Sequence, residues 1–208
     1  MVMSPHDALA RLKEGNQRFV TGVRSLEALL SHTRRAELAA EQHPFAIVLG
    51  CSDSRVPAEV VFDQGLGDLF VIRVAGNIVA PSQVGSVEFA AARFGTRLVV
   101  VLGHTQCGAI LATLEEARDR RSASPNLQSI VDRIRPSVDT LLATGLPLDG
   151  PDLVRQAVRA NVRASADHLR HGSALLERLI RDGNLLVVGA EYSLETGAVD
   201  FFDGIRPS

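Results

Sequence analysis

Tryptophan is absent from this 208-residue sequence, and tyrosine occurs only once. Proteins that bind single-stranded nucleic acid commonly stack its bases on aromatic side chains, and this chain is poorly supplied with them. An excess of positive charge is also missing, because 22 lysines and arginines are set against 24 aspartates and glutamates, for a formal net charge of −2. We therefore expect neither nucleic acid nor an anionic membrane surface as a partner.

Long apolar runs and targeting signals are missing as well. No stretch approaches the roughly 18 apolar residues of a membrane-spanning helix, and the first residues lack the basic start and apolar core of a secretory signal. These absences predict a cytoplasmic protein. Cysteine is scarce, with only Cys51 and Cys107, and in a reducing compartment such cysteines more often bind metal or act in catalysis than form a structural disulfide.

What the sequence does contain is a set of four short apolar runs, at residues 45–50, 68–74, 97–103 and 184–190. None alternates cleanly between apolar and polar residues, which is typical of parallel strands that are covered on both faces. Helical patterns lie between and after these runs, at residues 82–94, 108–119 and 152–171. We therefore predict an α/β fold with a central, mostly parallel β-sheet flanked by helices.

The two ends of the chain add one feature each to this prediction. Ser4 and Pro5 are typical of a helix start, and Leu9, Leu12 and Phe19 follow at roughly helical spacing. We expect residues 1–40 to form an N-terminal helical arm whose apolar face needs a surface to pack on. Near the C-terminus, residues 189–202 suggest two strands joined by a glycine-containing turn, which predicts a hairpin at one edge of the sheet. We interpret residues 1–208 as a single domain.

Reactive side chains follow two of the predicted strands. Cys51, Asp53 and Arg55 come directly after the first run, and His104 and Cys107 follow the third. Because the carboxyl ends of parallel strands share one edge of a sheet, we expect both cysteines and the histidine to lie together. Two thiolates and one imidazole suit Zn²⁺, and three protein ligands with an open fourth position are typical of a catalytic zinc site. Asp53 is the nearby residue whose oxygen could fill that position.

Each of these residues also has a plainer interpretation. The two cysteines could be small buried residues at strand ends, and His104 alone would more often be a hydrogen-bonded structural histidine. Asp53 and Arg55 alone would most often form a local salt bridge, which contributes little to stability when it is exposed. The joint arrangement favours the metal site, because both cysteines of the chain follow strands that are expected to be neighbours.

The motifs resemble those of the β-class carbonic anhydrases. "CSDSRV" at 51–56 and "GHTQCGA" at 103–109 are similar to the two signature motifs of that family, in the same order and at a similar separation. "FVIRVAGN" at 70–77 and "LKEGNQRFV" at 12–20 are similar to further family segments, so that the resemblance covers roughly residues 5–205.

The resemblance implies a zinc enzyme that reversibly hydrates carbon dioxide to bicarbonate and a proton, by attack of a hydroxide held on the metal. Its zinc ligands would be Cys51, His104 and Cys107, and Asp53 and Arg55 match the catalytic pair of the family. Some members also have a closed state in which the matching aspartate becomes the fourth ligand. We treat this state as a hypothesis for Asp53.

The resemblance also implies self-association, as a homodimer or as a dimer of dimers (a homotetramer). In such a dimer the N-terminal arm packs on the partner subunit, and Gln42 and Phe70 match residues that line the neighbouring subunit's pocket. Ala75 and Gly108 are the other expected pocket residues; glycine at 108 lets backbone amides come close to an anionic oxygen.

Regulation by bicarbonate is a further property of some members of the family. Those members carry a tryptophan three residues before the first cysteine, together with an arginine and a tyrosine. Arg73 and Tyr192 match the latter two, whereas Val48 stands at the tryptophan position. The missing tryptophan argues against this form of regulation.

Two other functions stay open at this point. The same scaffold and metal could hydrolyse carbon disulfide or carbonyl sulfide, because these linear electrophiles are open to the same attack. Alternatively, the metal could only stabilise a binding protein that has no turnover. Loss of activity with retention of zinc on replacement of Asp53 would separate the enzyme from the binding protein.

Overall fold

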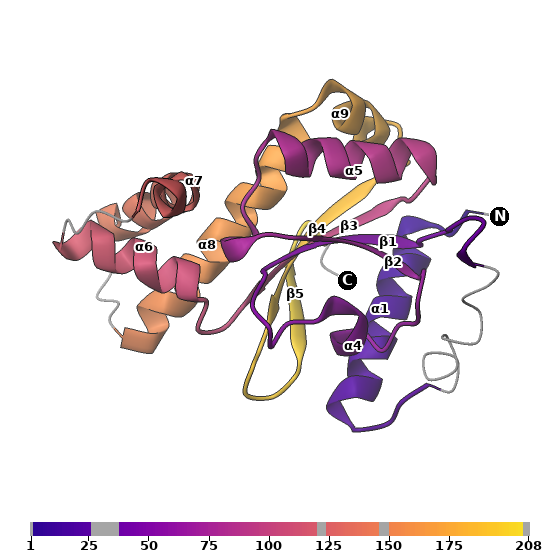
Figure 1. Cartoon of the computed structure of the whole chain (residues 1–208), viewed down its shortest axis with the longest axis horizontal. Helices are drawn as coiled ribbons and strands as arrows, with labels where there is room; N and C mark the ends of the chain where they lie inside the picture. The colour runs from indigo at the N-terminus through magenta and orange to yellow at the C-terminus, as the bar shows by residue number, and fades with distance from the viewer. Residues whose placement is uncertain (1, 26–37, 120–123, 146–149, 206–208) are drawn as a thin grey trace.

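A five-stranded sheet forms the centre of the computed structural model, which describes residues 2–25, 38–119, 124–145 and 150–205 (Figure 1). The strand order is β2-β1-β3-β4-β5. Strands β1 to β4 run parallel, and β5 pairs antiparallel with β4. The strands are β1 (Ala46–Gly50), β2 (Leu69–Arg73), β3 (Leu98–His104), β4 (Leu186–Tyr192) and β5 (Val199–Asp203). The predicted α/β class, the mostly parallel sheet and the edge hairpin are confirmed.

Helices cover both faces of the sheet (Figure 1). Their bounds are α1 (Pro5–Val20), α4 (Ala58–Val61), η2 (Ala75–Asn77), α5 (Pro81–Arg93), α6 (Gly108–Asp119), α7 (Pro125–Ala143), α8 (Gly150–His171) and α9 (Ala174–Arg181). Helices α5, α8 and α9 pack on one face, and α1 and α4 pack on the other. Helices α6 and α7 form a third cluster with part of α8 beside the carboxyl ends of the strands. Within the described ranges, no helix combines the length and the apolar character that a membrane span requires.

Strand β3 occupies the middle of the sheet, and every one of its residues is buried. Its apolar side chains alternate between the two clusters: Leu98 and Val100 join the core under α1, and Val99 and Val101 join the core under α5 and α8. Burial on both faces explains why the sequence of this strand is a continuous apolar run. This burial also fixes the position of the strand, and with it the position of its last residue, His104.

The N-terminal helix α1 packs on its own chain. Ser4 caps it by accepting a hydrogen bond from the backbone of Asp7 at 3.1 Å, and Pro5 occupies its first turn, as the sequence indicated. Ala8 and Leu12 are fully buried against the core formed by β1, β3 and α4. Within the single chain, its own sheet thus provides a surface for the apolar face of α1. Residues 26–37 of the predicted arm lie outside the described residues, and a contact between residues 1–40 and a second copy stays a prediction.

Candidate metal centre

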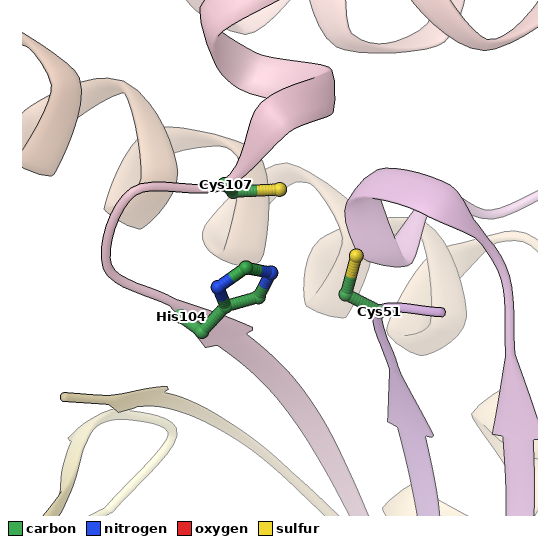
Figure 2. A group of neighbouring side chains, drawn as sticks. All are labelled: Cys51, His104 and Cys107. Carbon is green, nitrogen blue, oxygen red and sulfur yellow. The ribbon is translucent and has the colours of Figure 1, made fainter. Parts of the chain in front are cut away.

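The carboxyl ends of two adjacent strands bring together the residues that the sequence singled out. Strands β1 and β3 pair in parallel, with Gly50 opposite Leu102. Cys51 follows β1 directly, His104 is the last residue of β3, and Cys107 precedes α6. Figure 2 shows the three side chains pointing into a common space from these positions.

The three potential ligand atoms lie within 4.8 Å of one another, and all three residues are buried. Nδ1 of His104 lies 2.9 Å from the carbonyl oxygen of Thr105, so that Nδ1 carries the proton and donates it to this oxygen. Nε2 therefore presents its lone pair to the two sulfur atoms, and it is buried without a hydrogen-bond partner. An orphaned imidazole nitrogen beside two thiols is costly unless a further group satisfies it. Two soft sulfur ligands and one nitrogen fit a zinc ion at this place.

The pKa values of the two thiols shift in opposite directions. A hydrogen bond from Cys107 lowers the pKa of Cys51 despite its burial, with a smaller contribution from the backbone N–H of Gly76. The same hydrogen bond, together with burial, raises the pKa of Cys107. A thiolate already prepared at Cys51 suits the site for a cation, which would displace the remaining proton from Cys107.

Asp53 and Arg55 form a two-pronged ion pair at the mouth of this cluster. Oδ1 accepts from Nε of Arg55 at 2.9 Å, and Oδ2 accepts from Nη2 at 2.8 Å. The backbone N–H of Arg55 donates to Oδ1 as well, at 3.0 Å. These hydrogen bonds from Arg55 hold the pKa of Asp53 well below its ordinary range, so that the carboxyl stays ionised. Its Oδ2 lies 3.9 Å from Nε2 of His104, which places the carboxylate beside the ligand atoms.

The turn between His104 and Cys107 is held by Glu195, a residue that the sequence did not point to. Glu195, in the turn between β4 and β5, accepts hydrogen bonds from Thr105 Oγ1 at 3.0 Å and from Gln106 Nε2 at 2.7 Å. Gln106 has a positive φ of 55°, which is uncommon for a residue other than glycine. Glu195 thus holds the two residues that separate His104 from Cys107. No local sequence motif could predict this contact, because about 90 residues separate the partners.

The expected pocket residues lie in two different places. Gly108, at the start of α6, directly follows Cys107, and Ala75 in η2 precedes Gly76, whose N–H donates to Sγ of Cys51. Gln42 precedes β1 and is exposed, at the opposite end of the strand from Cys51. Phe70 is the second residue of β2, and its ring lies beside Phe94. In their own chain, Gln42 and Phe70 are thus remote from the cluster, and their place in the pocket of a second copy stays a prediction.

Arg73 and Tyr192, the residues expected for bicarbonate regulation, end two different strands of the sheet, β2 and β4. Arg73 donates to the carbonyl oxygens of Cys51 at 3.1 Å and of Asp53 at 2.7 Å, so that its guanidinium braces the strand end. Tyr192 ends β4, two strands further across the sheet than β1, and its ring lies beside that of Phe19. Val48 is fully buried in β1. A regulatory role for Arg73 and Tyr192 stays a prediction, which the valine at position 48 disfavours.

Comparison with known proteins agrees with the motifs. The sequence model of the family described as carbonic anhydrase matches residues 46–199. Carbonic anhydrase 2 of Mycobacterium tuberculosis is 40% identical over 202 residues, which are 97% of this chain and 95% of that protein. The carbonic anhydrase of Mycolicibacterium smegmatis is 38% identical over 197 residues, or 95% of this chain and 93% of that protein. Among solved structures, the β-carbonic anhydrase CafA of Aspergillus fumigatus has a TM-score of 0.77 at 25% identity, over 97% of this chain and 92% of that chain.

Proposed function

The chain belongs to the β class of the carbonic anhydrases, and from this premise we propose that it reversibly hydrates carbon dioxide to bicarbonate and a proton. In this proposal a zinc ion is held by Cys51, His104 and Cys107. The supporting observation is the convergence of the two sulfur atoms and Nε2 of His104 within 4.8 Å, beside the carboxylate of Asp53. When bound, zinc supplies Lewis-acid chemistry, because it makes coordinated water acidic enough to provide a hydroxide nucleophile near neutral pH.

Asp53 orients the nucleophile in this proposal. Because the hydrogen bonds from Arg55 keep its pKa low, the carboxylate acts as a hydrogen-bond acceptor and not as a proton store. Its Oδ2, on the side of His104, accepts the hydrogen of the attacking oxygen and turns a lone pair toward carbon dioxide. Arg55 restricts Asp53 to this orientation through its two hydrogen bonds.

Gly108 shapes the space in front of the cluster. It is exposed and begins α6, where the first N–H groups of a helix have no partner within the helix. The absence of a Cβ atom at this position leaves room for an oxygen of the nascent bicarbonate. The positive end of the helix dipole stabilises the negative charge that develops on this oxygen.

Self-association and a cytoplasmic location belong to the same proposal. Phe70 and its neighbours Phe89 and Phe94 form an aromatic group beside β2, at one edge of the sheet, and Phe89 is 54% exposed. We propose that this surface packs against a second copy to form a homodimer. Both cysteines are free thiols, and a reducing cytoplasm would keep them able to bind metal.

Stopped-flow measurement of carbon dioxide hydration by the zinc-loaded protein tests this function. We expect turnover by the parent, and loss of turnover with zinc retained in an Asp53→Ala variant. Equal hydration rates in the two proteins would contradict the role given to Asp53. A parent that hydrolyses carbonyl sulfide or carbon disulfide but does not hydrate carbon dioxide would contradict the choice of substrate.

A further inference from the structure

The short helical turn η2 delivers a backbone hydrogen bond to the metal cluster. The N–H of Gly76 donates to Sγ of Cys51 at 3.3 Å, and both groups are buried. Hydrogen bonds to a thiolate withdraw negative charge from the sulfur, and such outer contacts tune how a ligand binds a metal. The direction of this N–H therefore affects how strongly the sulfur of Cys51 donates electrons to a bound metal.

The backbone that aims this N–H has an unusual conformation. Gly76 has a φ of 71° and a ψ of 16°, and Asn77 follows with a φ of 43°. Two consecutive residues with positive φ are rarely stable unless the surrounding structure holds them. Glycine is required at the first position, because a Cβ atom there would lie 2.7 Å from Ile134 Cδ1 and 3.1 Å from the Cβ of Ala109.

Two polar side chains of α8 hold the carbonyl groups of this turn. Nδ2 of Asn161 donates to the carbonyl oxygen of Gly76 at 2.8 Å, and Oγ of Ser165 donates to that of Asn77 at 3.1 Å. Asn161 is 2% exposed and Ser165 is 6% exposed. The two residues are four positions apart and so project from the same face of the helix. The two side chains therefore fix the planes of the Gly76–Asn77 and Asn77–Ile78 peptides, which directly follow the N–H of Gly76 and restrict the backbone dihedral angles that aim it.

We propose that Asn161 is a positioning residue for the metal centre: it fixes the turn at Gly76 so that the N–H of Gly76 stays on the sulfur of Cys51. Ser165 supports the same turn from the next position on the helix face. Neither side chain contacts the cluster, so that they act through the backbone of η2. This inference rests on the proposed function, because it assumes that Cys51 binds the metal.

The test replaces Asn161 by leucine, which has a similar size but no N–H to donate. Removing the hydrogen bond at Gly76 frees the turn and leaves Cys51 a more electron-rich ligand. In cobalt-substituted protein, we expect the sulfur-to-cobalt charge-transfer band to move to longer wavelength, because a sulfur without its hydrogen bond gives up electron density more easily. In chelator competition, we expect zinc to bind about tenfold more weakly, because the freed turn no longer holds Cys51 in its ligand position, and this loss outweighs the stronger donation by its sulfur.

Asn16→Leu is the matched control. Asn16 is also a buried amide on a helix, and its Nδ2 donates to the carbonyl oxygens of Val61 and Gly197, at 3.1 and 2.9 Å. The control loses comparable hydrogen bonds in α1, whose core cluster does not contain the cysteines. We expect it to reduce the melting temperature and to leave the cobalt band and the zinc affinity as in the parent.

If Asn161→Leu does not fold, Ser165→Ala replaces it in the test. We then expect a smaller shift of the cobalt band and a smaller loss of zinc affinity. Unchanged cobalt bands and zinc affinity in the folded variants would overturn the inference while leaving the metal site intact. Equal changes in the Asn16 control would overturn it too, because they would show a general loss of stability. A parent that binds neither metal would instead overturn the proposed function, and this inference with it.

Discussion

Asp53 and Arg55 meet through two parallel hydrogen bonds, Oδ1 to Nε and Oδ2 to Nη2, at 2.9 and 2.8 Å. The side chain of Arg55 is 51% exposed, whereas that of Asp53 is 17% exposed and lies next to His104. The guanidinium thus approaches from solvent and holds the carboxylate over the cluster. In this arrangement Asp53 is bound to Arg55, and a movement of Asp53 to a bound metal would first have to break both hydrogen bonds.

Arg55→Gln should therefore lower the hydration rate while zinc stays bound. Asp53 would lose the partner that fixes its orientation, and we expect kcat to fall by about 10- to 100-fold, in the range found when a supporting contact of a metal site is removed. Stopped-flow kinetics together with zinc analysis measures both quantities. Arg178→Gln, an exposed position on α9, serves as the control. A kcat equal to that of the parent would show that Arg55 does not position Asp53.

Glu195→Ala should accelerate the loss of zinc. Thr105 and Gln106 would lose their acceptor, and the left-handed conformation of Gln106 would no longer be held between His104 and Cys107. We expect zinc to leave about tenfold faster in the presence of a chelator. The fold should persist, because Glu195 is exposed. Glu14→Ala on α1 removes an exposed carboxylate elsewhere, and a similar acceleration in that variant would contradict the role of Glu195.

The buried carboxylate of Asp63 should make stability depend on pH. Burial alone would raise its pKa, but hydrogen bonds from Arg18, the backbone of Ser25 and Arg24 outweigh this effect and lower the pKa below 3.8. A carboxyl with a lowered pKa in the folded state stabilises the protein above its unfolded-state pKa, and this contribution is lost as the pH falls further.

Asp63→Asn should accordingly reduce the free energy of unfolding by about 2 kcal/mol at pH 7, since two arginines lose a charged partner. Urea denaturation between pH 7 and pH 3 should show this difference to be constant above about pH 4 and to shrink below it. Asp167→Asn, whose side chain is 68% exposed, should change stability little. A difference that grows as the pH falls would contradict the account.

Phe89→Asp should weaken self-association. The ring of Phe89 packs edge-on against Phe94 at a centroid distance of 5.5 Å and remains 54% exposed, beside the edge strand β2. A charge placed there would be buried in the proposed dimer, which is unfavourable without a partner. Sedimentation equilibrium should give a mass above one chain for the parent and a lower mass for the variant. Leu142→Asp, at an exposed position on α7, is the control, and a parent with the mass of a single chain would contradict the proposed surface.

The sheet and the core of the metal site could be predicted because local sequence determines them. A parallel strand that is covered on both faces must be apolar throughout, as β3 is, and its carboxyl end then places His104. Strand β1 pairs with β3, although β2 lies between them in the sequence, and this pairing brings Cys51 close to His104 and Cys107.

Helix α7 shows why other features escaped the sequence analysis. It begins at Pro125 within a turn-rich stretch and contains Pro136, which removes a backbone hydrogen bond and commonly costs about 3 kcal/mol inside a helix. Burial of Ile134 and Val138 against α6 and α8 offsets this cost, and such burial depends on the whole fold. Asn161 and Glu195 escaped for a related reason, since each contacts backbone or side chains 85 or more residues away.

X-ray absorption at the zinc edge of the metal-loaded protein tests the central claim most directly, namely that Cys51, His104 and Cys107 hold the ion. The account predicts two sulfur scatterers at about 2.3 Å and an imidazole nitrogen at about 2.0 Å, with one further light atom. A first shell of nitrogen and oxygen atoms without sulfur would contradict it.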